Sequence, residues 1–107
     1  MRNTMKNIAT ISERSERYEE WIKVFGTDQV PIINILVPQI ANVLGEVRKV
    51  YMLDLGKLSE DQLIRLKEHL SRKFSIPMEE VERDLPEIGV PILAEDVSLS
   101  SDELFFL

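Results

Sequence analysis

The stretch RKVYMLDLGKLSEDQLIRLKEHLSRKF, Arg48 to Phe74, carries the clearest structural signals in the chain and decides its fold. At the ends of residues 48–55 polar and apolar residues alternate, and in the middle the residues at odd and at even positions are both apolar. This pattern predicts a β-strand that is covered on both faces. Ser59 followed three residues later by Gln62 matches a helical capping box. A helix over residues 60–73 is therefore predicted, and its apolar stripe is formed by Leu63, Leu66, Leu70 and Phe74.

Two further helices flank this strand and helix. Pro77 opens a helix over residues 77–85 whose acidic side chains face outward, and Pro86 and Gly89 end it. Upstream, apolar residues at i, i+3, i+4 and i+7 predict a helix over residues 12–25 with the buried face Tyr18, Trp21, Ile22 and Phe25.

Residues 30–44 admit two interpretations. Ile33, Leu36, Val37, Ile40 and Leu44 follow helical spacing, and Pro38 would lie harmlessly in a first helical turn, so we expect a helix over residues 34–44. The segment VPIINILV is rich in β-branched residues, however, and a strand over residues 30–37 remains the alternative.

Together these elements predict an α+β fold in which three to four helices pack on a small sheet. That sheet includes the strand 48–55, with residues 97–100 as a candidate second strand. Residues 1–11 are polar and show no periodicity, so we expect a flexible N-terminal arm. Residues 12–107 are expected to form a single globular domain, since this length can bury a core without cross-links.

Charge is distributed unevenly along the chain. The net charge is −6, yet residues 74–107 hold nine acids and one base, a net charge of −8. A negative surface of this kind repels phosphate groups, so we expect no direct binding to nucleic acid. The absence of cysteine excludes disulfides and thiolate metal sites.

No segment of the sequence predicts a membrane span or a secretion signal. The longest apolar stretch, residues 30–44, is interrupted by prolines and amides and is shorter than the roughly 20 residues that a spanning helix needs. The N-terminus has basic residues with no apolar run behind them. We therefore expect a soluble, cytoplasmic protein.

The C-terminal run of acids and serines does not predict a metal site. Asp96, Ser98 and Ser100 match the first ligand positions of a calcium loop, but Ser101 stands where glycine is needed and Leu107 where glutamate is needed. No cofactor or metal is predicted.

Two polar residues are possible catalytic groups. Asp54 ends the predicted central strand, a place where α/β proteins often carry chemistry, but no acid, base or ligand lies near it in sequence. His69 is the single histidine and is expected on the surface of helix 60–73. No catalytic residue is predicted, and an enzyme centred on Asp54 is kept as an alternative.

Two groups of residues are candidates for binding a partner. The first is the acidic face of the helix 77–85. The second is the apolar C-terminus, whose burial would gain roughly 1.5–3 kcal/mol per side chain and would exceed the cost of ordering it. It is expected to dock on the protein's own core or on a partner. The candidate residues are Glu79, Glu80, Glu82, Asp84, Leu104, Phe105, Phe106 and Leu107.

The run VYMLDLGKLSEDQLIRLKEHLSRKFSIPMEEVERDLPEIGVPILAED, residues 50–96, resembles short uncharacterised proteins of prokaryotic and phage genomes. In those proteins a strand, a leucine-rich charged helix and a VPILAED-like segment follow one another. The resemblance implies a small accessory protein and assigns no site residue.

The sequence thus favours a non-enzymatic accessory or protein-interaction module that binds another protein or a second copy of itself. A DNA-mimicking inhibitor of a nucleic-acid-binding protein is the second hypothesis, because the acids of the C-terminal third could imitate phosphate charge.

Overall fold

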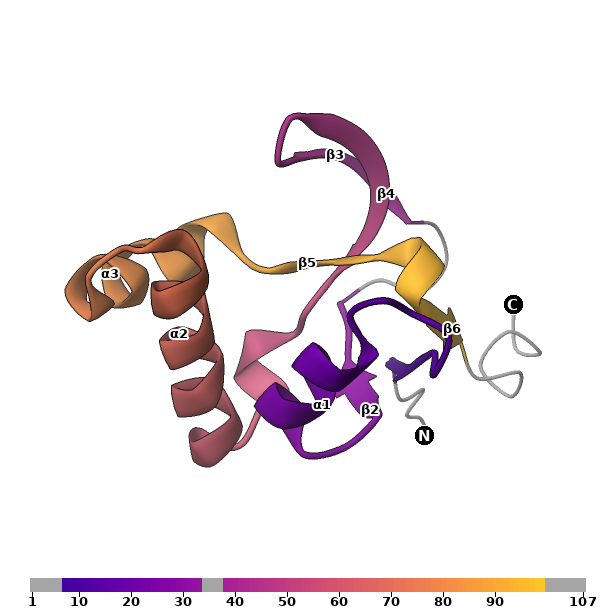
Figure 1. Cartoon of the computed structure of the whole chain (residues 1–107), viewed down its shortest axis with the longest axis horizontal. Coiled ribbons are helices and arrows are strands. Elements are labelled where there is room, and N and C mark those ends of the chain that lie inside the picture. The colour runs from indigo at the N-terminus through magenta and orange to yellow at the C-terminus, as the bar shows by residue number, and fades with distance from the viewer. Residues whose placement is uncertain (1–6, 34–37, 100–107) are drawn as a thin grey trace, which may run out of the picture.

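The computed structural model describes residues 7–33 and 38–99, which form an α+β arrangement (Figure 1). The predicted fold class is confirmed. In chain order the elements are β1 (Ile8–Ile11), α1 (Tyr18–Phe25), β2 (Gln29–Pro31), β3 (Gln39–Val43), β4 (Glu46–Met52), the 3-10 turn η1 (Leu55–Lys57), α2 (Glu60–Phe74), α3 (Met78–Ile88), β5 (Pro91–Leu93), the 3-10 turn η2 (Ala94–Asp96) and β6 (Val97–Leu99).

Within these residues the strands form two antiparallel sheets, in the orders β2-β1-β6 and β3-β4-β5. Ala9 lies at the centre of the first sheet, opposite Val30 on one side and Leu99 on the other. A bridge between Ile32 and Leu53 connects the two sheets. Segments from both ends of the chain therefore meet in one sheet, and the second sheet lies against it.

One hydrophobic core joins α1, α2, α3 and both sheets. Its most deeply buried members come from every part of the described chain, and Leu66 of α2 is fully covered. The core residues are Ala9, Ile11, Trp21, Val24, Phe25, Val30, Ile32, Tyr51, Leu53, Leu66, Leu85, Val90 and Ile92.

The predictions for α2 and α3 are confirmed with small changes at their ends. The Ser59 side chain accepts from the Gln62 backbone N–H at 3.1 Å, and the Gln62 side chain accepts from the Ser59 N–H at 2.9 Å, so the capping box is present. α3 continues past Pro86 to Ile88, although a proline inside a helix removes one backbone hydrogen bond and crowds the carbonyl four residues earlier. Gly89, with φ of 76°, then ends it.

The predicted start of the first helix was too early. α1 begins at Tyr18, not at residue 12. Instead, the hydroxyls of Ser12 and Ser15 accept hydrogen bonds from the backbone N–H groups of Arg14 and Arg17, two residues further on. Such serine turns compete with helix formation, which explains the shorter helix.

The prediction of a helix over residues 34–44 was wrong for the described part. Residues 39–43 are β3, which pairs residue for residue with β4. Leu44 and Gly45 form the turn between them with φ of 52° and 88°, a pair of positive angles that favours a tight hairpin and excludes a helix. Residues 34–37 lie outside the described part. The strand alternative was correct at Val30 and Pro31, which belong to β2.

Two further expectations about strands need correction. Residues 8–11 were placed in the N-terminal arm, but they form β1, the central strand of its sheet, because Ala9 and Ile11 alternate inward with polar or partly exposed neighbours. The strand predicted at 97–100 is present over Val97–Leu99 as β6, and residue 100 lies outside the described part; β6 pairs with β1 and does not share a sheet with β4. The predicted strand 48–55 corresponds to β4, which ends at Met52.

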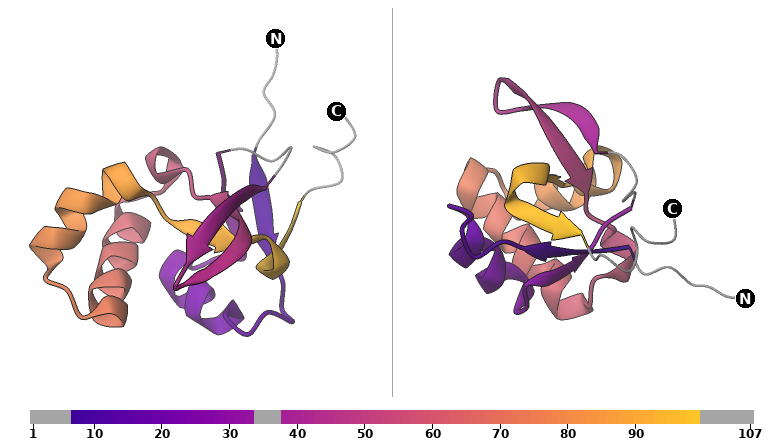
Figure 2. Two further views of the ribbon diagram at one scale, coloured as in Figure 1. Left: turned by 90° about the horizontal axis from the view of Figure 1, so that it is seen from above. Right: turned by 90° about the vertical axis from the view of Figure 1, so that its right-hand side faces the viewer.

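The β3–β4 hairpin extends away from the rest of the molecule (Figure 2). Helices α2 and α3 lie at the opposite side, and β5 runs between them and the hairpin (Figure 1). Side chains from the hairpin, from β5 and from both helices line the candidate site described below.

Candidate functional site

A groove of about 570 Å3 lies between the β3–β4 hairpin, β5 and the helices α2 and α3. One wall is the inner face of the hairpin and the other is formed by the C-terminal half of α2 and by α3. Its lining is mainly apolar and comprises Val43, Leu44, Leu70, Phe74, Ile76, Val81, Leu85, Ile88, Val90, Pro91 and Leu93, among other residues.

Several apolar side chains at the edges of the groove are exposed to solvent. Leu44 at the hairpin tip is 77% exposed, Ile88 at the end of α3 is 71% exposed, and Phe74 at the end of α2 is 46% exposed. Single exposed apolar residues are ordinary on protein surfaces, but exposed residues on both walls of one concave apolar site are typical of binding surfaces.

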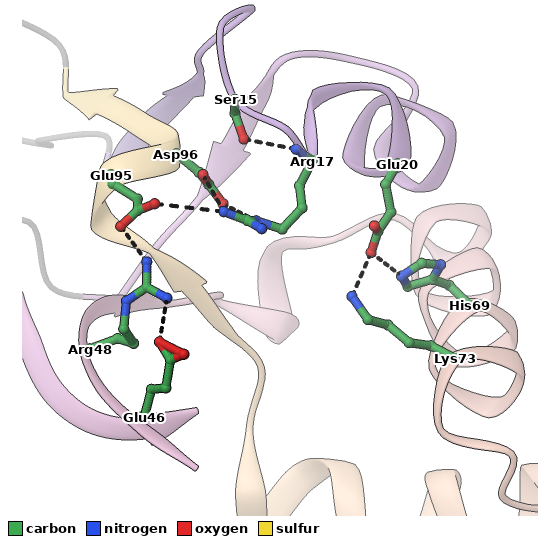
Figure 3. A network of polar contacts seen from close by, with 9 residues as sticks. All are labelled: Ser15, Arg17, Glu20, Glu46, Arg48, His69, Lys73, Glu95 and Asp96. Carbon is green, nitrogen blue, oxygen red and sulfur yellow. Dashed lines mark hydrogen bonds and ion pairs between the residues drawn. The ribbon is translucent and has the colours of Figure 1, made fainter. Parts of the chain in front are cut away.

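A partly buried ion pair between Arg17 and Asp96 lines the groove where it meets α1. Arg17 donates through Nε to Oδ2 of Asp96 at 2.6 Å and through Nη2 to Oδ1 at 3.1 Å, a two-bond contact (Figure 3). The Asp96 side chain is 3% exposed. The hydrogen bond to Asp96 raises the pKa of Arg17 above its usual value despite partial burial. This contact holds the start of α1 against η2.

A second arginine extends this network to the hairpin. Arg48 of β4 binds Glu95 directly and lies 3.4 Å from Glu46, while Glu95 also lies 3.8 Å from Arg17 (Figure 3). The hydrogen bond to Glu95, with its negative charge, raises the pKa of Arg48. The hairpin wall of the groove is therefore tied to the segment that follows β5.

A third polar cluster lies where α1 packs on α2. Oε2 of Glu20 lies 2.8 Å from Nε2 of His69 and 2.9 Å from Nζ of Lys73 (Figure 3). Partial burial by itself would raise the pKa of Glu20, but the hydrogen bonds and charges of Lys73 and His69 outweigh it, and the pKa is lowered.

His69 is less exposed than expected from the sequence. Its side chain is 16% exposed, and its ring lies 5.8 Å from that of Trp21. Trp21 also lines the groove, and its buried indole Nε1 has no hydrogen-bond partner among the described residues. A group that enters the groove would therefore approach the single tryptophan of the chain.

The four acids proposed from the sequence do not act as one set. Glu80 and Asp84 line the groove, whereas Glu82 lies 3.8 Å from Lys67 of α2. Asp84 pairs at 3.1 Å with its exposed neighbour Arg83. Within the described part of the chain, neither Glu79 nor Glu80 forms an ion pair. The other four proposed residues, Leu104, Phe105, Phe106 and Leu107, lie outside the described residues.

Asp54 lies apart from these contacts. Its backbone N–H donates to Pro31, its carbonyl accepts from Lys57, and it precedes η1. It borders neither the groove nor a smaller hollow between α1 and α2. Across residues 7–33 and 38–99, no three histidine or acidic side chains gather as a metal site requires.

The positively charged side chains that line the groove have acidic partners within the chain, whereas the acids of α3 are less well paired. The three cations of the groove, Arg17, Arg48 and Lys73, each contact one or more acids of this chain. Glu80 forms no ion pair among the described residues, although its charge acts on Arg83 of the same helix, and the one ion pair of Asp84 is with that same side chain, which is 71% exposed. α3, which carries five acids and one base, therefore brings an excess of negative charge to its wall of the groove.

Sequence reasoning missed the arginines and the hairpin that build this site. Arg17 and Asp96 are 79 residues apart, so no local pattern relates them. The hairpin did leave a signal: Gly45 separates two segments of alternating residues, which is typical of a two-residue turn.

Comparisons with protein-family models, with curated proteins and with solved structures find no match for this chain. No helix in the described ranges has both the length and the apolar character needed to cross a membrane.

Proposed function

We propose that this protein is a non-enzymatic interaction module whose groove binds an apolar segment of a partner protein that carries basic side chains. The observation behind this proposal is the concave apolar surface between the hairpin and α3, with exposed Leu44 and Ile88 on opposite walls. Burying such side chains under a partner removes apolar area from water, which is the main driving force for association.

The charge of the groove favours a basic occupant. α3 carries five acids and one base, and two of those acids, Glu80 and Asp84, lie on the groove wall. Since the cations of the groove are already paired within the chain, an acidic segment would find no free positive charge, whereas a lysine or arginine would find Glu80. An amphipathic helix with an apolar face and basic flanks is the occupant that fits best.

The apolar C-terminus, Leu104–Leu107, remains part of this proposal as a second contact with the partner or as a segment that docks within the chain. The DNA-mimic hypothesis draws on the same acids of α3. Unlike the groove-binding proposal, the DNA-mimic hypothesis requires only the negative charge of these acids. It therefore predicts that binding depends on Glu80 and Asp84 and not on Ile88.

The single tryptophan provides the assay, since Trp21 lines the groove. Its fluorescence would be followed while the protein is titrated with two designed amphipathic helices of identical apolar face, one with lysine flanks and one with glutamate flanks. We expect the lysine peptide to bind with a micromolar dissociation constant and the glutamate peptide to bind at least tenfold more weakly.

Matched variants locate the contact. Ile88 and Ile40 are exposed isoleucines, 71% and 65% exposed, but only Ile88 lines the groove. Ile88→Lys should weaken the lysine peptide at least tenfold, and Ile40→Lys should leave its affinity unchanged. Glu80→Gln should weaken it severalfold and reduce its salt dependence. Absence of binding by both peptides, or equal effects of the two lysine variants, would refute the proposal.

A further inference from the structure

Among the described residues, β3 is the outer strand of its sheet. It pairs with β4 on one side, and no described strand lies on its other side. In a hairpin with a two-residue turn, the pair next to the turn, here Val43 and Glu46, is hydrogen-bonded, and the bonding alternates along the strands. The N–H and C=O groups of Ile40 and Asn42 consequently point away from β4.

The pairing on the far side of β4 agrees with this alternation. Leu53 donates its backbone N–H to the carbonyl of Val90 on the β5 side. Odd-numbered residues of β4 thus face β5, and even-numbered residues, beginning with Glu46, face β3. The pairing next to the turn and the pairing of β4 with β5 therefore both indicate that the backbone N–H and C=O groups of Ile40 and Asn42 point away from β4.

β3 carries neither the charges nor the bulges that normally protect edge strands; its short length and Pro38, directly before its first residue, are the protecting features present. Native edges carry lysine or other charges, prolines, or bulges that block pairing with another chain. The five residues of β3, QIANV, contain no charge and no proline, and they pair with β4 without a bulge. Ile40, which is 65% exposed, and Val47, which is 73% exposed, lie close together on one face of the hairpin.

We propose that β3 pairs with β3 of a second copy of this chain, antiparallel and centred on Ala41. In this register Ile40 of one copy lies opposite Asn42 of the other, and their outward N–H and C=O groups form four hydrogen bonds across the two-fold axis. Ala41 is small enough to face its own copy at the axis. The exposed side chains of Ile40 of one copy and Val47 of the other then lie on the same face of the joined sheet.

Electrostatics permit this contact even though each chain has a net charge of −6. The charged residues of the hairpin lie on β4, and in the joined sheet β4 of one copy is three strand spacings, about 14 Å, from β4 of the other. That separation exceeds the screening length of about 10 Å at 0.1 M salt. Arg48 of one copy is therefore not repelled appreciably by Arg48 of the other.

The size of the contact sets its strength. A contact between two five-residue strands is small compared with the roughly 1,200–2,000 Å2 that stable interfaces bury. We therefore expect a weak, reversible dimer that forms at high micromolar to millimolar concentration. The pairing places the groove-facing sides of both hairpins on one side of a six-stranded sheet, and it does not depend on what the groove binds.

The experiment is sedimentation equilibrium of the full chain over a concentration series, for the wild type, Ile40→Lys and Ile88→Lys. The two variants make the same chemical change at isoleucines of similar exposure, and only Ile40 lies on the β3 edge. We expect a dimer for the wild type and Ile88→Lys, and at least a tenfold weaker dimer for Ile40→Lys. A wild type that stays monomeric at millimolar concentration would overturn the proposal.

Amide hydrogen exchange identifies the edge directly. The N–H groups of Ile40 and Asn42 should exchange rapidly at low concentration and become protected as the concentration rises. Those of Ala41 and Val43, which bond to β4, should show protection that does not depend on concentration. A dimer in which Ile40 and Asn42 remain unprotected, or one that Ile88→Lys disrupts and Ile40→Lys does not, would equally overturn the proposal.

Discussion

Replacement of Asp96 by asparagine is expected to destabilise the protein strongly, because it removes the charge that a buried arginine contact requires. Asp96 is 2% exposed and receives two hydrogen bonds from Arg17. The asparagine keeps the size of the side chain but can accept only one of these bonds, and its amide group would face a guanidinium nitrogen.

The size of the expected stability loss depends on how exposed Asp96 and Arg17 are. Removal of one member of a fully buried ion pair costs about 3–5 kcal/mol, because the remaining charge is left without compensation. Arg17 is 29% exposed and has Glu95 at 3.8 Å, so part of its charge stays compensated. We therefore expect Asp96→Asn to lower the free energy of unfolding by about 2–3 kcal/mol.

Urea unfolding at neutral pH, followed by circular dichroism, measures this loss. Glu95→Gln is the control: it removes the charge of the adjacent acid, which lies 3.8 Å from Arg17 and binds Arg48 directly, but at a side chain that is 60% exposed. It should cost less than about 1 kcal/mol, as surface ion pairs do. The reasoning would be refuted if Asp96→Asn cost no more than Glu95→Gln.

Three further changes are expected to alter stability in defined ways. Leu66→Ala empties a fully buried position and should cost about 3 kcal/mol in urea unfolding; a loss below about 1 kcal/mol would contradict the described core. Gly89→Ala should cost about 2 kcal/mol, because φ of 76° with ψ of −179° is a backbone conformation that glycine alone adopts readily; the flexible end of Met52 beside the added Cβ can move aside, so a neutral effect would contradict this reasoning from the backbone. Glu20 has a lowered pKa in the folded state, so its stabilisation is present above its ordinary pKa of 4.5 and is lost as the pH falls through the folded value. Glu20→Gln should therefore be less stable than the wild type at pH 7 and approach it at low pH; an equal deficit at all pH values would contradict the ionic role.

The sequence predicted well those elements whose signals are local. The helix α2 has its cap, its apolar stripe and its charged outer face within one continuous segment, and both its start and its end were predicted to within a residue. The strand β4 was found for the same reason. Such elements are specified by contacts between near neighbours, and a periodic pattern reports them directly.

The helix prediction failed for the β3–β4 hairpin because the apolar residues of β3 and of the turn are not buried. Ile40 and Leu44 fit a helical stripe by spacing, and the spacing argument assumes that such residues face a core. Both are largely exposed, so their spacing carried no information on burial. The positive φ angles of Leu44 and Gly45 decided the local structure.

The site could be predicted only in part. Glu80 and Asp84 were proposed as partner-binding residues from charge alone, and the structure places both on the groove wall. The other wall depends on the hairpin, and the part of the groove next to α1 depends on Arg17 meeting Asp96 across 79 residues. Contacts of this separation arise from the tertiary fold and leave no pattern in a single sequence.

The most direct test of the interaction proposal is a nuclear magnetic resonance titration of the isotope-labelled chain with the lysine-flanked amphipathic peptide. The account predicts shifts concentrated at Leu44, Ile88 and the indole N–H of Trp21, with little change in the β2-β1-β6 sheet. It would be contradicted by shifts confined to that sheet, or by a spectrum that the peptide leaves unchanged.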